Sequence, residues 1–129
     1  MTTPDELERQ HTLATATSRY DELRMRDALA AMDDEGPALS LPESLELLAL
    51  SEVVIRKAGY GRQAMVRTAR ATGASWTQIG AALGTSKQAA WEAHTRWIED
   101  QARQHEQSGF QGLDAGEAGR ARGLAGRPD

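Results

Sequence analysis

A short polar run, Ser86-Lys87-Gln88, carries the side chains with the clearest binding chemistry in this sequence. The Lys87 ammonium can donate to guanine O6 and N7, and the Gln88 amide can pair with N6 and N7 of adenine. The Ser86 hydroxyl can bond a phosphate while it caps a helix. Such contacts need a rigid element that holds the three residues in place, so the surrounding pattern decides what they can do.

That pattern predicts two helices joined by a tight turn. Residues 75–78, Ser-Trp-Thr-Gln, form a capping box that starts the first helix, and Gly84 ends it after about eight residues. Thr85 or Ser86 then caps the second helix, which we expect to run to about residue 107. The polar run therefore lies at the beginning of a long helix.

The glycines in this stretch match the needs of two helices that cross closely. Gly84 stands at the turn, where φ must be positive, and Gly80 stands four residues earlier, where the helices approach most closely. Ile79 and Leu83 are expected to face inward from the first helix. From the second helix we expect Ala90 inward, with Ala93 or Trp97.

From about Arg62 to Trp97 the chain resembles the helix-turn-helix units of bacterial repressors and of sigma-factor promoter-reading domains. The amino-acid sequence of this stretch is most similar to those of small actinobacterial DNA-binding proteins. The resemblance implies an all-α protein that lays its second helix in the major groove of double-stranded DNA. Two residues depart from the pattern: Thr85 replaces a branched apolar residue, and Trp91 replaces a polar base-reading residue.

By position, the resemblance implies a groove-facing set and a set of phosphate contacts. The groove-facing set is Ser86, Lys87, Gln88, Trp91 and Glu92. The phosphate-contact candidates are Thr77, Gln78, Thr95, Arg96, Arg62, Arg67 and Arg70.

Three residues of the groove-facing set have alternative roles. Gln88 can complete a capping box with Thr85 instead of reading a base. Trp91 can stack on a thymine methyl or a sugar, or it can lie in the core or in a dimer interface. Glu92 can accept from a cytosine amino group or merely repel phosphates.

Charge is distributed unevenly in the 129-residue chain, whose total is −4. Residues 1–52 carry a net charge of −8, residues 53–97 a net charge of +6, and residues 98–129 a net charge of −2. A basic segment sets the local potential that a phosphate backbone meets, whatever the total charge. The alternative is that these arginines and lysines only solvate helix faces.

The remaining pattern predicts an all-α helical bundle of about five helices without wing strands. Residues 1–36 are predicted to hold one helix from Pro4 to about Asp33, broken near residues 15–18, which packs on the next helix or serves as a dimerisation arm. Residues 40–107 form the predicted helical core. Within it, residues 42–58 are apolar nearly all round and predict a central buried helix.

Two further segments complete the predicted order. A third helix is expected over residues 62–72, with Ala64, Met65 and Ala69 facing inward. Residues 108–129 contain few large apolar side chains, so we expect a disordered tail.

Several function classes are disfavoured by composition and motifs. The chain has no cysteine, which favours a cytoplasmic protein, and no apolar run long enough to indicate a membrane span. The DNA binding implied by the resemblance would make it nucleoid-associated. Its three histidines, at positions 11, 94 and 105, do not make a metal site, and His94 is expected at the surface or an interface. The glycines at 59 and 61 lack the βαβ unit and acidic residue of a dinucleotide site. We therefore expect no cofactor and no enzymatic activity.

Two functional hypotheses follow. The first is a sequence-specific DNA-binding transcriptional regulator that acts as a homodimer on a palindromic site. The second is a protein-interaction adaptor that uses the same helical scaffold to dock on transcription machinery or another regulator through its acidic N-terminal half.

Overall fold

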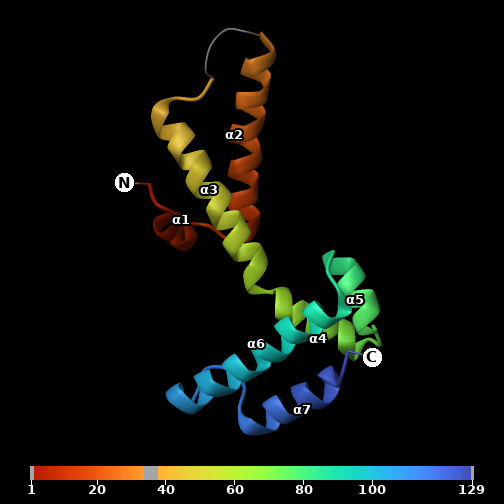
Figure 1. The fold of residues 1–129 in the computed structure, drawn as a ribbon. Coiled ribbons are helices and arrows are strands. Elements are labelled where there is room, and N and C mark those ends of the chain that lie inside the picture. Colours follow the sequence, from red (N-terminus) through yellow and green to blue (C-terminus); the bar gives the residue numbers. More distant parts are fainter. Residues whose placement is uncertain (1, 34–37, 129) are drawn as a thin grey trace. The chain divides into compact units, whose positions relative to one another are not determined.

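The computed structural model describes residues 2–33 and 38–128, and in these residues the secondary structure is entirely α-helical (Figure 1). This confirms the all-α class, with more helices than expected. The helices are α1 (Pro4–Gln10), α2 (Leu13–Asp33), α3 (Leu41–Tyr60), α4 (Arg62–Ala71), α5 (Trp76–Leu83), α6 (Lys87–Ser108) and α7 (Ala115–Ala125). Residues 34–37 of the connection between α2 and α3 lie outside the described residues.

The chain divides into two compact units, Met1–Gly61 and Arg62–Asp129. We call them the N-terminal and the C-terminal unit. This division corrects the expected boundaries at residues 36, 40 and 107, because α3 belongs with α1 and α2 and the C-terminal residues belong with the helix-turn-helix stretch.

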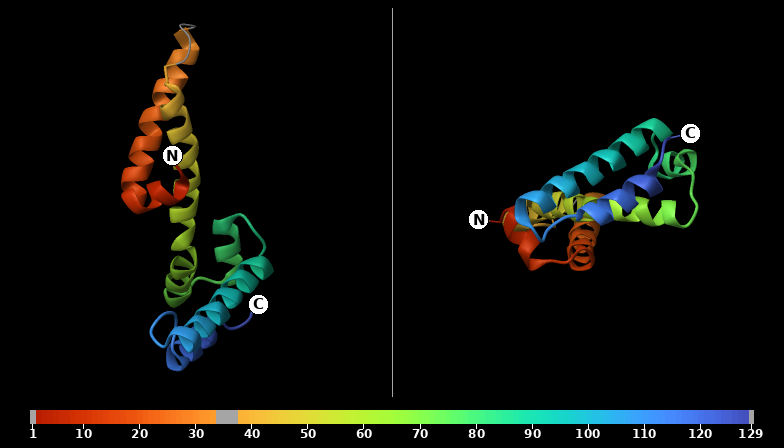
Figure 2. Two further views of the ribbon diagram at one scale, coloured as in Figure 1. Left: turned by 90° about the vertical axis from the view of Figure 1, so that its left-hand side faces the viewer. Right: turned by 90° about the horizontal axis from the view of Figure 1, so that it is seen from below.

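The N-terminal unit is an antiparallel hairpin of α2 and α3, with α1 packed against α3 (Figure 2). Its core contains Leu7, Leu23, Leu50 and Val53. Ion pairs join the helices: the Arg19 guanidinium donates to both carboxylate oxygens of Glu46 at 2.9 Å, and the pair fixes the register of α2 against α3.

Two predictions about these helices are wrong in part. The N-terminal helix breaks at residues 11–12, earlier than expected, because Thr12 caps α2 by accepting from the backbone of Thr15. The helix α3 is buried on one side only, so it is no central core helix. In the N-terminal unit α3 packs against α2 and the short α1, and these two helices leave Leu41, Leu48 and Ile55 largely exposed.

In the C-terminal unit α6 packs against α5 near its start and against α7 along its length (Figures 1 and 2). The helix α7 also contacts α4. Val66, Trp76, Ile79 and Ile98 form the large-residue part of the core. The inward residues of α4 differ from the prediction: Val66 is buried and Ala69 is partly buried, whereas Ala64 and Met65 are exposed.

The expected disordered tail is the clearest error. Residues 115–125 form α7, whose Ala118, Ala121 and Ala125 are buried against the rest of the unit. Asp114 and Glu117 form a capping box at its start. A count of large apolar residues overlooks such a helix, because alanines let it approach its neighbours closely.

None of the described helices has both the length and the apolar content needed to span a membrane.

Candidate nucleic-acid interface

The turn between α5 and α6 has the geometry that the two glycines predict. Gly84 has φ of +73°, in the left-handed region that costs residues with a side chain about 1–2 kcal/mol. A Cβ atom placed on Gly80 would lie 2.8 Å from the backbone oxygen of Thr85 and 2.9 Å from the backbone nitrogen of Lys87. The close approach at Gly80 and the positive φ at Gly84 are both confirmed.

Capping side chains fix where the two helices begin. Ser75 and Gln78 form the predicted capping box of α5. Ser86 caps α6 by accepting from the backbone of Ala89 at 3.0 Å. Gln88 does not join a box with Thr85, because its amide donates to Glu92 at 2.8 Å instead.

One face of α6 is polar and exposed at its start. Gln88, Glu92 and Arg96 recur every four residues and share this face, and all three are exposed; Lys87 is exposed in the first turn, on another side of the same helix. The hydrogen bond between Gln88 and Glu92 orients the Gln88 amide along this face. Ser86, exposed beside them, presents its hydroxyl to the backbone of α6.

Trp91 does not belong to this exposed face. Its ring is half-buried at the flank of α6, and its indole N–H donates to the carbonyl oxygen of Gly126 at 2.7 Å. Of the roles considered for Trp91, stacking on DNA or packing in the core or a dimer interface, the structure shows contact within the chain: Trp91 holds the segment that follows α7.

Four predicted phosphate contacts have different surroundings. Arg62 is exposed. Arg67 lies over the Trp97 ring, 5.6 Å from its centroid. Arg70 lies over Trp76 and donates to the backbone oxygens of Leu124 and Ala74, which makes it a structural residue rather than a phosphate ligand.

The fourth of these residues, Thr95, is also unsuited to bind a phosphate. Its hydroxyl oxygen is buried and has no hydrogen-bond partner among the described residues. Since a buried oxygen cannot reach the DNA backbone, we do not retain Thr95 as a phosphate contact.

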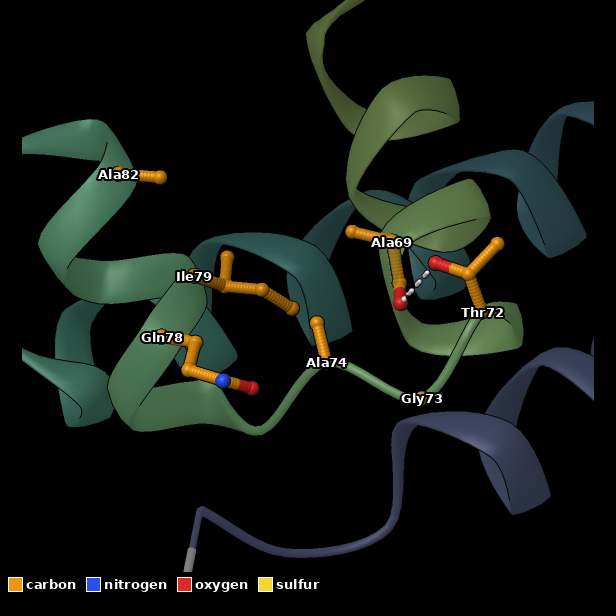
Figure 3. A pocket seen from close by; sticks show the side chains of 7 residues that line it. All are labelled: Ala69, Thr72, Gly73, Ala74, Gln78, Ile79 and Ala82. Carbon is orange, nitrogen blue, oxygen red and sulfur yellow. Dashed lines mark hydrogen bonds between the residues drawn. The ribbon is translucent and has the colours of Figure 1, made fainter.

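The start of α5 borders a hollow of about 480 Å³ between α4 and α5 (Figure 3). Gln78 lines the hollow and accepts from the backbone of Ser75 through its Oε1, which leaves its Nε2 as a donor. Thr77, the next residue back on α5, is exposed. Most other side chains around the hollow are small, and the Thr72 hydroxyl donates to the backbone of Ala69. The hollow thus offers few polar groups beyond Gln78.

Behind the exposed face lies an aromatic stack of Trp76, His94 and Trp97, of which only His94 was expected elsewhere. His94 is 1% exposed rather than at the surface, with its ring centroid 5.6 Å from that of Trp76 and 5.5 Å from that of Trp97. Its Nδ1 lies 2.9 Å from the Gln63 side-chain oxygen. Burial lowers the pKa of His94 to about 4, and the positive charges of Arg67 and Arg70 act in the same direction.

The residues after α7 lie beside the exposed face and were missed entirely. Gly126, Arg127 and Pro128 line a hollow of about 540 Å³ together with Gln88 and Trp91. Nothing in the local sequence signals this proximity, because it depends on how α7 packs.

Comparisons of the chain with protein-family models, with curated proteins and with solved structures gave no match. The site comprises a tight turn, a helix that exposes Lys87 in its first turn and Gln88, Glu92 and Arg96 along one face, and a C-terminal segment anchored beside it.

Proposed function

We propose that the protein binds double-stranded DNA sequence-specifically through α5 and α6 as a helix-turn-helix, and that it acts as a transcriptional regulator. The observation that carries the proposal is that Lys87, Gln88, Glu92 and Arg96 are exposed on a helix whose start is positioned by the Gly80–Gly84 turn. Lysine and glutamine are side chains that discriminate guanine and adenine in the major groove. The proposed role is binding, without catalysis, in the cytoplasm at the nucleoid.

The charge around this face supports phosphate binding with fewer residues than the sequence suggested. Arg62, Lys87 and Arg96 are exposed cations of the C-terminal unit, whereas Arg70 is occupied by backbone carbonyls. Thr77 and Gln78 supply neutral donors at the start of α5. In a helix-turn-helix complex the first helix crosses the DNA backbone, so donors there position the second helix.

Sequence preference tests the proposal. Duplexes are selected from a random-sequence library by the wild-type protein, and affinity is then measured for the best duplex and a scrambled one. The double substitution Lys87→Ala and Gln88→Ala is expected to reduce the affinity ratio between the two duplexes by about tenfold or more, because each bidentate base contact contributes about 1–3 kcal/mol.

Arg96→Ala is the matched control, since Arg96 is exposed on the same helix and its replacement also removes one positive charge. It is expected to weaken both duplexes alike. If Lys87→Ala with Gln88→Ala also weakened both duplexes equally, base reading by these residues would be refuted. If the wild-type protein bound no duplex at low salt, the proposed function would fail.

We further propose that the regulator is a homodimer that pairs through α3. Its exposed apolar side chains, Leu41, Leu45, Leu48 and Ile55, recur at spacings of four, three and seven residues, and each is between 50% and 74% exposed. This is the spacing of a helix seam. The only charge within the seam, Glu52, is paired with Arg56 of the same helix at 3.2 Å.

This seam is suited to pair with the same seam of a second copy of the chain. A two-fold interface needs a surface that complements itself. With the axis at Leu48, an antiparallel partner places Leu48 against Leu48 and Leu41 against Ile55. If each side chain offers on the order of 100 Å² of apolar surface, the seam supplies roughly the apolar half of the ~800 Å² that each partner buries in a standard interface.

Sedimentation measures this pairing. The double substitution Leu45→Asp and Leu48→Asp is expected to convert a dimer to a monomer without loss of helicity, since both side chains are exposed in the single chain. Leu13→Asp, an exposed leucine near the start of α2, is the control and should leave the dimer intact. A monomeric wild-type protein, or a dimer that survives the double substitution, would contradict pairing through α3.

The adaptor hypothesis loses one of its supports. It drew partly on an aromatic residue at a base-reading position, and Trp91 instead donates to Gly126 of the same chain. The acidic N-terminal half remains, but Arg19, Arg26 and Arg56 pair with carboxylates there. We therefore keep DNA binding as the proposed function, with an adaptor as the outcome if no duplex is bound.

A further inference from the structure

The end of α7 is held at the start of α6 by three side chains from elsewhere in the C-terminal unit. Its last carbonyls lack partners within the helix, as at every helix end. Arg70 donates to the oxygen of Leu124, Trp76 to that of Ala125 at 2.7 Å, and Trp91 to that of Gly126 at 2.7 Å. Three consecutive carbonyls are thereby fixed, which sets the path of the residues that follow.

The path leads along the flank of the exposed face of α6. At Gly126 the backbone leaves the helix with φ of +56°, and Arg127 and Pro128 then line the 540 Å³ hollow shared with Gln88 and Trp91. Figures 1 and 2 show the C-terminal end of the chain in this part of the unit. Proline restricts the backbone of this segment, so less conformational freedom is lost when it meets a ligand.

Arg127 differs from Arg122 and Arg103, which pair with carboxylates. Arg122 forms a bidentate pair with Glu99, and Arg103 pairs with Asp100. The Arg127 side chain is exposed and has no hydrogen bond or ion pair with any of the described residues. Its guanidinium is therefore a cation beside Gln88 that no other described residue occupies.

We propose that residues 126–128 form a second DNA-contacting element, in which the Arg127 guanidinium binds a backbone phosphate beside the groove that α6 enters. The proposal rests on the proposed function. When a helix lies in the major groove, its flanks face the phosphates of the two strands. A guanidinium matches a phosphate with two parallel hydrogen bonds. Trp91 is then a positioning residue, which accounts for a tryptophan at a position where the resemblance implies a base reader.

Affinity for the selected duplex is measured by fluorescence anisotropy across a series of salt concentrations. Arg127→Ala is expected to weaken binding about fivefold to tenfold for selected and scrambled duplexes alike, since a phosphate contact reads no sequence. The slope of log affinity against log salt concentration should also become shallower by about 0.9, the value for one phosphate contact. Because Arg127 is exposed, its replacement leaves the fold intact.

Arg120→Ala is the matched control. It removes the same charge from the same part of the chain, but Arg120 lines a separate hollow with Arg67, Glu117 and Leu124. It should leave affinity and salt slope near the wild-type values. Trp91→Phe, which removes the donor to Gly126, should reproduce part of the Arg127→Ala defect, and the double variant should be no weaker than Arg127→Ala alone.

The possible failures are distinguishable. If the wild-type protein binds DNA but Arg127→Ala binds with unchanged affinity and salt slope, the second contact is overturned while the proposed function stands. Equal weakening by Arg127→Ala and Arg120→Ala would also overturn it, because the effect would then be one of net charge. If the wild-type protein binds no DNA, the proposed function itself has failed.

Discussion

Replacing Gly80 with alanine is expected to destabilise the C-terminal unit by about 3 kcal/mol. The added Cβ would lie below 3.0 Å from three backbone atoms of residues 85–87, and backbone atoms cannot move aside as a flexible side chain can. The start of α6 would have to shift away from α5, which would also misplace Lys87 and Gln88. DNA affinity should therefore fall together with stability.

Tryptophan fluorescence during urea unfolding of the full chain measures the loss of unfolding free energy in the C-terminal unit. All three tryptophans, Trp76, Trp91 and Trp97, belong to the C-terminal unit, so their signal reports on that unit. Gly119→Ala is the control: Gly119 is a helical glycine with open space around its Cβ position. It should raise stability by about 0.5–1 kcal/mol. Equal behaviour of the two variants would refute the close approach at Gly80.

Acidification is expected to destabilise the same unit through His94. The folded state holds the pKa of this histidine at about 4, below the ordinary value of 6.5, because the ring is buried and faces Arg67 and Arg70. The unfolded chain therefore binds a proton more readily. The stabilising contribution is complete above pH 6.5 and is lost as pH falls towards 4, by roughly 2–3 kcal/mol between pH 7.5 and 4.5.

Urea unfolding at pH 7.5 and 4.5, followed by tryptophan fluorescence, separates this effect from carboxylate titration. His94→Phe keeps a planar ring between the tryptophans and removes the titrating group, so the difference in unfolding free energy between the two pH values should shrink by roughly 2 kcal/mol. His105→Gln removes a histidine outside the stack and should keep the wild-type difference. The same pH difference in His94→Phe as in the wild type would show that His94 is not the responsible group.

The sequence by itself determined the features that depend on neighbouring residues. The capping box at Ser75 forms as predicted, and boxes of the same kind start α1 at Thr3 and α3 at Ser40, because each needs only a side chain and a backbone three residues apart. The turn at Gly84 and the contact at Gly80 also followed from the sequence. Both are imposed by sterics within a single pair of adjacent helices.

Only the tertiary structure decided the roles that depend on partners far along the chain. Arg70 and Trp76 donate to residues about fifty positions away, and Trp91 to a residue thirty-five positions away. These contacts exist because the alanine face of α7 allows close packing, a property that local hydrophobicity does not record. For the same reason the burial of His94 and the position of Arg127 beside Gln88 could not be predicted: each is set by the arrangement of several helices, and not by the residues next to it.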